Sequence, residues 1–489
     1  MRDSSVYHPR SVVRLTVALG LILCLCACSR TFQLSVDPPG AYVLVDGQPA
    51  KESRPLTAAA ESVSIYARKT GYVDFERTFE IPNGLTPHDI RIALELKTYD
   101  IMVDVTEGRS TCDIDGRPRG ETPVRLSLTH GTHRLVLRRN GFPDLEAVLE
   151  ARRPGRYLYR MQPETQTLRP LGVFDCGRQP KQVIFSPNDR FLYIPLLDGE
   201  GFQIFDMQGL EMRPTVRVGP KPRSHAFPEG LFIEKYHSFF VSQMSTNRIF
   251  EYAYSDDGAV TFRRSLSSGG VFPKFLAWCE QLDLVAVSNW ITDDVALIDY
   301  GSGKIVKKIG GLATPRGLAF SADGSLLFIA SYDGGNVFRY ATGTWKETHR
   351  FFRPGGCMRH IVLSPDGRRC FVSDMSKYVV YELGTEDLSL IHTYKASWNT
   401  NTISLDSRGR FLFISNRGPN NKINYTLRSP VDGRVLVYDT ADKTLAATIT
   451  GGNQPTGLDV SADDRYLVFT NFLDRNFEIY DISSLETGD

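Results

Sequence analysis

Residues 314–340 read TPRGLAFSADGSLLFIASYDGGNVFRY, and this segment is the clearest copy of the repeat from which the fold is predicted. The runs 317–320, 326–331 and 336–340 predict three short strands. Two turns rich in Asp and Gly, at 321–324 and 332–335, separate them, and Asp-Gly supplies the positive φ that a hairpin turn requires. A sheet of this size has two unpaired edges and cannot bury both faces, so it requires further copies of itself.

The pattern recurs from about residue 165 to the end of the chain, mostly at spacings of 42 to 48 residues, and the sixth unit carries an insertion. Seven units of four strands at such a period predict an all-β fold, a seven-bladed β-propeller over residues 164–489. The hairpin of each unit is expected at residues 186–189, 234–235, 279–280, 321–324, 364–367, 407–409 and 461–464.

The last unit provides only three predicted strands, at residues 456–460, 466–471 and 477–482. The segment 168–176 precedes the first unit and is predicted to be the missing outer strand. The propeller would then be closed by its own N-terminal strand, which removes the free edge. Because that strand starts on the hairpin side, we expect the preceding modules to attach there. The long loops 213–229 and 417–434 fall on the other side, which we expect to bind a ligand.

The repeat resembles the seven-bladed propellers of the YVTN/YncE type. Val295-Ala-Leu-Ile-Asp299 followed by Thr314-Pro-Arg-Gly317 is the stretch that matches best. In that family V-x-V-x-D, a glycine turn and P-x-G-x-x-x-S-P-D-G recur. The resemblance implies the propeller fold and does not by itself imply an activity.

Two smaller β modules precede the propeller. Residues 32–47, FQLSVDPPGAYVLVDG, with Gly71-Tyr72 further on, resemble the PEGA family of small β-sandwich modules in bacterial envelope proteins. A second copy has its VDG-like step at 112–116 but carries Glu107-Gly-Arg-Ser110 in place of Pro-Gly-Ala. The predicted domains are 1–27 (signal peptide), 28–98 (first module), 99–163 (second module) and 164–489 (propeller).

The first residues form a targeting segment. Basic residues precede an apolar run at 15–27 that is too short to span a bilayer. The run ends Leu25-Cys-Ala-Cys28, which resembles a bacterial lipobox, with Cys26 as a departure. The resemblance implies a lipoprotein: lipidation (palmitate) at Cys28 and anchoring in the cell envelope, on the periplasmic side or at the cell surface.

Composition and cysteine usage exclude some classes of function. The chain is 42% hydrophobic with a net charge of +1, which argues against a nucleic acid partner. Five cysteines lie outside the targeting segment, and their odd, scattered set is not a disulfide framework. If Ser364-Pro-Asp-Gly367 is a tight hairpin, Cys357 should face Asp374 and not Cys370.

Polar residues are predicted to gather at the mouth of the propeller channel. Basic residues stand at the start of several inner strands. Amides and one acid stand at the ends of the second strands. Cations that converge in a low-dielectric funnel attract an anionic group more strongly than they do in water. The candidate ligand-binding residues are Lys181, Gln243, Lys274, Asn289, Arg316, Arg359, His360, Asp374, Asn416 and Asn471.

The favoured function is a non-catalytic, lipid-anchored binding or scaffold protein of the cell envelope. Its partners would be the membrane and an envelope protein or anionic polymer, and a monomer is favoured. No cofactor, metal or catalytic motif is recognised. The alternative is a hydrolase of the lactonase type acting at the channel mouth, since related propellers include such enzymes and Glu229, His360 and Asp374 could form an acid–base group.

Overall fold

The computed structural model describes residues 30–50, 55–84, 86–162, 168–219 and 225–487. The predicted signal peptide and Cys28 lie outside the described residues. Strands dominate, and the described helices are a 3-10 turn at Glu234–Tyr236 and α2, Ser484–Thr487. In the described part of the chain, no helix combines the length and apolarity needed to cross a membrane.

Residues 314–340 form the expected hairpins. Strand β29 spans Pro315–Phe320, β30 Leu326–Ser331 and β31 Asn336–Ala341, followed by an outer strand, β32, Lys346–Phe352. In the first turn Gly324 has φ +70°, as an Asp-Gly turn requires. Ser321 Oγ donates to Asp323 at 2.5 Å and accepts from the backbone N–H of Leu326 at 2.9 Å. The local sequence therefore fixes both the turn and the strand ends.

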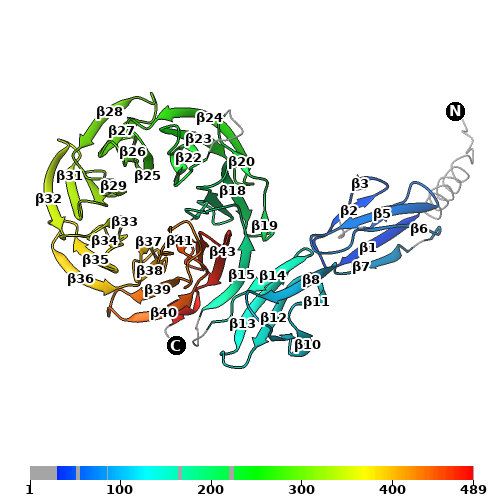
Figure 1. Cartoon of the computed structure of the whole chain (residues 1–489). Coiled ribbons are helices and arrows are strands. Elements are labelled where there is room, and N and C mark those ends of the chain that lie inside the picture. The colour runs from blue at the N-terminus through cyan, green and yellow to red at the C-terminus, as the bar shows by residue number, and fades with distance from the viewer. Residues whose placement is uncertain (1–29, 51–54, 85, 163–167, 220–224, 488–489) are drawn as a thin grey trace, which may run out of the picture. The chain divides into compact units, whose positions relative to one another are not determined.

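Sheets of this kind are arranged around a common centre (Figure 1), where residues of the inner strands line a cavity. Blades two, three, five and six have four strands each, like blade four. Their strands are β21 (Gly230–Ile233), β22 (Ser238–Gln243), β23 (Arg248–Tyr254), β24 (Val260–Ser267), β25 (Pro273–Cys279), β26 (Leu284–Asn289), β27 (Asp294–Asp299), β28 (Ile305–Gly310), β33 (Met358–Leu363), β34 (Arg369–Asp374), β35 (Val379–Gly384), β36 (Leu390–Lys395), β37 (Thr400–Leu405), β38 (Phe411–Asn416), β39 (Arg434–Asp439) and β40 (Leu445–Thr450).

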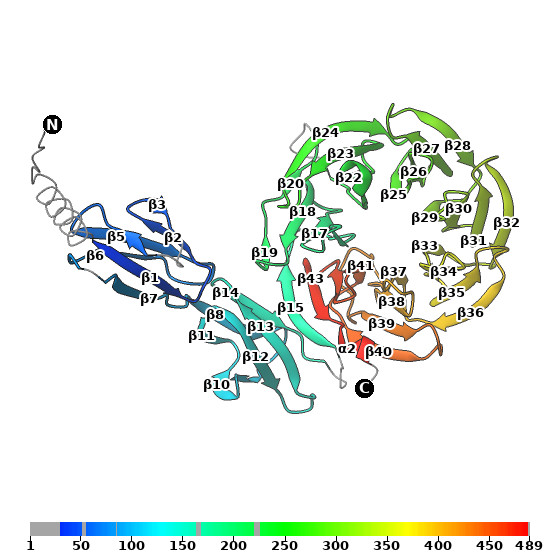
Figure 2. The ribbon, with the colours of Figure 1, turned by 180° about the vertical axis from the view of Figure 1, so that it is seen from behind.

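Blade one has a divided outer strand, and blade seven takes a strand from the other end of the propeller sequence. Strand β15 pairs antiparallel with β43, from Arg169 opposite Asp481 to Asp175 opposite Asn476. Figure 2 shows this junction from behind. The strands concerned are β16 (Ile184–Phe185), β17 (Phe191–Pro195), β18 (Gly201–Asp206), β19 (Glu211–Met212), β20 (Val216–Arg217), β41 (Pro455–Val460), β42 (Tyr466–Asn471), β43 (Asn476–Asp481) and β15 (Arg169–Asp175).

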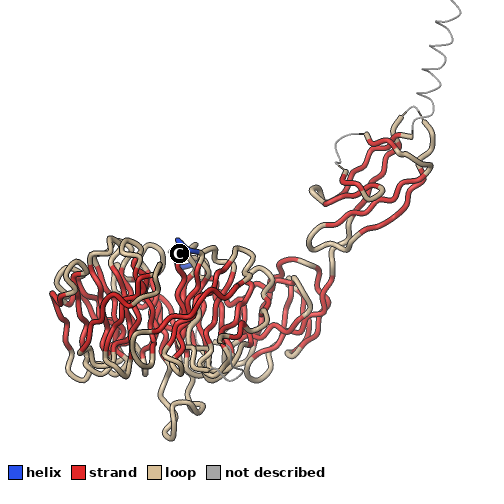
Figure 3. The backbone as a smooth tube through the Cα atoms, turned by 90° about the horizontal axis from the view of Figure 1, so that it is seen from above, coloured by secondary structure: helices blue, strands red, loops and turns tan. Residues whose placement is uncertain are grey.

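Apolar side chains from neighbouring blades stack into continuous layers. The cluster between blades three and four, for example, joins Val295 and Leu297 to Leu327 and Ile329, all fully buried. Loops collect on the two sides of the ring and strands lie between them (Figure 3). The rigid strands therefore hold the loops and the channel-lining residues in fixed positions.

The two N-terminal modules share one topology. In the first, sheet β4-β1-β7 lies with sheet β3-β2-β5-β6, and the second repeats this with β11-β8-β14 and β10-β9-β12-β13. Their strands are β1 (Thr31–Asp37), β2 (Tyr42–Val45), β3 (Gln48–Pro49), β4 (Leu56–Thr57), β5 (Ser62–Arg68), β6 (Phe75–Glu80), β7 (His88–Ala93), β8 (Thr98–Val105), β9 (Thr111–Ile114), β10 (Arg117–Glu121), β11 (Val124–Thr129), β12 (Gly131–Arg138), β13 (Leu145–Ala151) and β14 (Gly155–Tyr159).

Contacts divide the chain into two compact units. One holds the residues up to Ile101 with Leu126–Thr132 and Glu150–Pro154, and the other holds the rest of the second module and the propeller. The second module joins the propeller edge to edge, through β14 and β15 with Leu158 opposite Val173. Strand β15 starts on the hairpin side, but the expectation that this module attaches on that side is wrong, because strand pairing places it along the outer edge of blade seven.

The predicted register of the Cys357 hairpin is also wrong. Asp374 lies opposite Met358, and Cys370 lies opposite Leu363. The hairpin is wider than assumed, since the backbone N–H of Ser364 bonds the carbonyl of Arg369 at 2.9 Å. All five described cysteines are free.

Candidate functional site

The inner strands place a set of cations at equivalent positions around the channel. Lys274 in β25, Arg316 in β29 and Arg359 in β33 are each the second residue of their strand. A bulge follows at this point in every one of the three strands, between the first and the fourth residue. Bulges redirect side chains. Lys181, which precedes β16, and Arg417, which follows β38, join the same set, and all five are at most 9% exposed.

These five residues, the cation cluster, have few neutralising partners. Arg316 Nη2 donates to Glu229 Oε1 at 2.6 Å, and both side chains are buried. Arg359 Nε donates to Asn401 Oδ1 at 2.6 Å, and Arg417 donates to Gln454. Amides satisfy hydrogen bonds without neutralising charge, so positive charge exceeds negative charge here.

Several buried donors of the cluster and of Asn401, the partner of Arg359, have no hydrogen-bond partner among the described residues. They are Nε and Nη1 of Arg316, Nη2 of Arg359, Nε of Arg417 and Nδ2 of Asn401. A buried donor left unpaired costs about 1–3 kcal/mol, and more when it is charged. Such a group of unpaired donors at one place indicates a site that an acceptor-rich anion would complete.

The electrostatic environment of the cluster is unfavourable for cations. Burial, followed by Arg359, Arg316 and Arg417, holds the pKa of Lys181 well below its ordinary value. Burial and the neighbouring arginines do the same to the pKa values of Lys274 and Arg359, and burial lowers the pKa of Arg417 to about 10. Arginine stays protonated near neutral pH, so its lowered pKa means that the charged form is destabilised by its surroundings. A bound anion would relieve it.

Aromatic rings lie next to these cations. Lys274 Nζ is 4.2 Å from the ring centre of Trp290 and 4.9 Å from that of Phe272. The guanidinium carbon of Arg417 lies 5.2 Å from the ring centre of Phe472. Lys181 Nζ lies 5.6 Å from the same ring centre. Aromatic faces stabilise cations only partly and do not neutralise them.

The amides and the acid at the ends of the second strands have a different setting. Asp374 accepts backbone N–H groups of Cys357 (2.9 Å) and Lys377 (3.1 Å). Asn289 and Asn416 bond neighbouring turns, as do Gln243 and Asn471. These five predicted site residues therefore organise loops, whereas Lys181, Lys274, Arg316 and Arg359 converge. Ligand binding by any of the ten remains a prediction.

His360 lies deeper in the channel. It lines a cavity of about 430 Å³ together with Glu229 and Asp459. Burial, with Arg316 and Arg359, lowers the pKa of His360 to about 3, while burial raises the pKa of Asp459 to about 7. His360 and Asp374 do not share a hydrogen bond, so the acid–base group considered from the sequence is not assembled. The described residues contain no group of His, Cys, Asp or Glu suited to hold a metal ion.

Sequence reasoning missed Arg417 and Asp459 as channel residues. Arg417 directly follows the strand-ending Asn416, but it was assigned to a long loop whose course the sequence does not specify. Asp459 stands in an inner strand at the position of apolar or small residues such as Ala319 in β29. An acid in a buried repeat position was the signal available for it.

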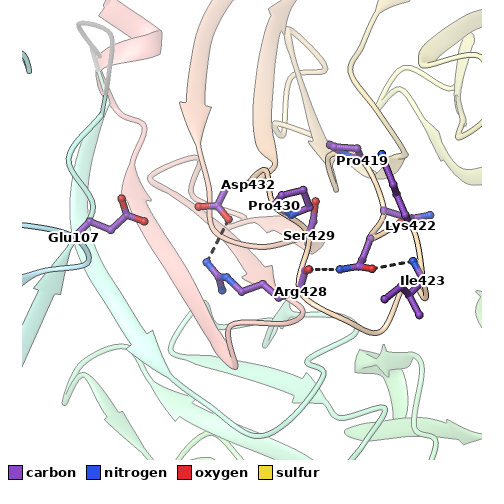
Figure 4. A pocket seen from close by; sticks show the side chains of 10 residues that line it. Glu107, Pro419, Lys422, Ile423, Arg428, Ser429, Pro430 and Asp432 are labelled. Atoms are coloured by element: carbon purple, nitrogen blue, oxygen red, sulfur yellow. Dashed lines mark hydrogen bonds and ion pairs between the residues drawn. The ribbon is translucent and has the colours of Figure 1, made fainter.

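The insertion loop, residues 417–433, borders the cluster. Gln454, the partner of Arg417, also donates to the carbonyl of Tyr425 at 2.8 Å, and Asn453 bonds Ser429. The loop and Glu107 of the second module line an open depression of about 1000 Å³ (Figure 4). Arg160, between module and propeller, is 3.1 Å from Glu478 and 3.7 Å from Asp432 of the loop. The loop is therefore held by the channel on one side and by the linker on the other.

Comparison with known proteins agrees with this architecture. The family model "Lactonase, 7-bladed beta-propeller" matches residues 337–488, and the PEGA domain model matches residues 98–158, the module that departs more from the PEGA signature. The chain is 34% identical over 336 residues to antigen Lp49 of Leptospira interrogans serogroup Icterohaemorrhagiae serovar copenhageni, over 66% of this chain and 72% of the relative. The chain belongs to the antigen Lp49 family. The lactonase match agrees with the β-propeller that the strand topology shows. Neither comparison defines a reaction.

Proposed function

We propose that this Lp49-family protein is a non-catalytic binding protein of the cell envelope, which captures an anionic ligand at the channel mouth. One observation carries the proposal: buried arginine donors lack partners, in a cluster where arginines act on neighbouring basic groups and one acid, Glu229, offsets them. Buried unsatisfied donors in a native protein require an explanation, and a bound anion would supply the missing acceptors.

The N-terminal part of the proposal rests on the sequence. Lipidation of Cys28 would anchor the chain in the envelope, on the periplasmic side or at the cell surface, and the PEGA modules would separate the propeller from the membrane. The pairing of β15 with β43 supports a ring closed by its N-terminal strand. A closed ring gives the channel mouth rigid walls.

The test is ligand-induced stabilisation of the full chain in detergent. Tripolyphosphate, citrate and sulfate serve as probes, with sodium chloride at matched ionic strength as reference. A ligand that binds only the folded state raises the free energy of unfolding by RT ln(1 + [L]/Kd), so Tm should rise with anion concentration. The rise should disappear in the double variant Arg316→Gln/Arg359→Gln.

Lys346→Gln is the matched control, because Lys346 is an exposed cation on β32 outside the channel. It should behave like the wild type. Equal stabilisation of wild type and double variant, or none in either, would refute an anion site in the channel.

The hydrolase alternative has one observation in its favour, the cavity that holds Asp459, whose pKa of about 7 suits proton transfer at neutral pH. A lactone substrate turned over by the wild type but not by Asp459→Asn, with anion binding unchanged, would support it. No turnover across a panel of lactones would favour the binding protein.

A further inference from the structure

Exposed apolar side chains lie on loops next to the cation cluster, on one side of the propeller. Ile423 of the insertion loop is 85% exposed, and Tyr425, Leu427 and Val431 of the same loop are about half exposed. The loop joins the second and third strands of blade six. The loops between second and third strands and the loops between blades share one side of a propeller, and this side is called the insertion face here.

Two other blades contribute to the insertion face. Trp398 precedes β37 and is 55% exposed, and its carbonyl accepts the backbone N–H of Gly418 at 3.1 Å. Ile291, between β26 and β27, is 64% exposed, next in sequence to Trp290, which contacts Lys274. Apolar groups therefore lie beside the cation cluster on the loops of blades three and six and on the loop between blades five and six.

The backbone of the insertion loop is fixed although its apolar tips are exposed. Asn453 and Gln454 bond Ser429 and Tyr425, Asn421 bonds Arg428, and Arg160 and Arg428 reach Asp432. A preordered loop loses little conformational freedom when a partner covers it. Buried arginines at a centre, surrounded by apolar and aromatic side chains, match the composition of protein-binding hot spots.

This composition distinguishes two kinds of anionic partner. A hydrated polyanion would gain from the cations but not from burying Ile423, Leu427 or Trp398. A peptide can place a carboxylate among the arginines and apolar side chains against the loop, and burial of each apolar side chain stabilises the complex. Charge complementarity and apolar exposure thus favour the same occupant.

We propose that the insertion face binds an acidic peptide segment of a partner protein, with its carboxylates in the cation cluster and its apolar side chains against the insertion loop. The inference rests on the proposed function and adds the class of ligand. The cluster provides the charge recognition, and Ile423 with Leu427 and Trp398 provides the apolar contact.

The test begins with a random peptide library displayed on phage and selected on the full chain. A selected peptide is then synthesised, and its Kd is measured by fluorescence anisotropy. We expect selected sequences to combine at least two acidic residues with Leu, Phe or Tyr. Arg359→Gln and, separately, Ile423→Ser/Leu427→Ser should each raise Kd by about tenfold or more, equivalent to about 1.4 kcal/mol.

Controls separate the possible outcomes. Phe352→Ser removes an apolar side chain, 52% exposed, from an outer strand and should leave Kd unchanged. Arg417→Gln provides a second test of the cluster if Arg359→Gln folds poorly. Polyphosphate serves as the hydrated polyanion probe.

Polyphosphate binding that requires Arg359 but not Ile423 and Leu427, with no acidic peptide selected, would overturn this inference and leave the proposed function standing. If neither peptide binding nor polyphosphate binding depends on Arg359 or Arg417, both this inference and the proposed function are refuted. Selected peptides without acidic residues would also overturn the inference.

Discussion

Arg316 donates a hydrogen bond of 2.6 Å to Glu229, and this ion pair joins blade four to blade two across the channel. Blade three lies between them in sequence, and Arg316 and Glu229 both act, in opposite directions, on the pKa of its Lys274. Both side chains are buried, so the pair is largely shielded from water. It is the one contact in which the cation cluster meets an acid at hydrogen-bond distance among the described residues.

Removing that acid should destabilise the protein. Glu229→Gln leaves Arg316 without a counter-charge, and breaking a buried pair from one side costs about 3–5 kcal/mol. Urea unfolding should show the loss, and affinity for tripolyphosphate should rise because Arg316 is released. Glu347→Gln, which removes a surface pair with Arg350, should cost under about 1 kcal/mol. Equal stabilities of Glu229→Gln and wild type would contradict the prediction.

Removing a cation that has no acidic partner should have the opposite effect. Arg359 bonds only a neutral amide among the described residues, and its Nη2 has no partner. Arg359→Met should leave the free energy of unfolding unchanged or raise it by about 1–2 kcal/mol, since apolar replacement of buried charge is often neutral or stabilising. Arg316→Met should lower it, because Glu229 would lose its partner. A loss above about 2 kcal/mol for Arg359→Met would show that the cluster is not strained.

Asp459 should make stability fall as pH rises. Burial raises its pKa to about 7, against about 3.9 in the unfolded chain. Between pH 4 and 7 the folded state binds more protons at this site, so its contribution to the free energy of unfolding declines with pH. Asp459→Asn keeps an acceptor for the N–H of Phe185 and removes the titration. The stability of wild type relative to this variant should decrease over that window, and parallel pH curves would contradict the assignment.

His360 should make stability rise with pH, opposite to the effect of Asp459. Burial lowers its pKa to about 3, against about 6.5 in the unfolded chain. Below pH 6.5 the unfolded state binds the proton first, so stability is lost as pH falls towards 3. The NMR signal of the His360 ring should not titrate between pH 5 and 8, and His360→Gln should flatten the acid limb of the stability curve. Titration of the ring near pH 6.5 would be incompatible with a buried channel position.

Lipid attachment should depend on one cysteine. Cys28→Ala should abolish incorporation of a palmitate analogue and shift the protein from the detergent phase to the aqueous phase of Triton X-114. Cys26→Ala is the matched control and should retain both properties. Labelling that persists in Cys28→Ala would exclude this lipobox.

Much of the fold could be predicted from local sequence. The turns around Asp323 and Asp366 close through their own side chains, and the alternating apolar residues between them specify strands that must pair. Strands β26, β38 and β42 each end at an asparagine, as the sequence repeat predicts. The hairpin register around Cys370 could not be derived, because a difference of two residues in the turn depends on one backbone hydrogen bond between Ser364 and Arg369.

The sequence by itself determined the seven-fold repeat, the PEGA-like modules and the placement of Lys274, Arg316 and Arg359 at equivalent inner positions. The three-dimensional structure was needed to show that Arg417 joins them, that Asp374 binds a turn instead, and that Glu229 from another blade pairs with Arg316. Strand and turn formation follow from neighbours in the chain, whereas the charge balance of a channel depends on side chains that the packing of successive blades brings together from distant segments.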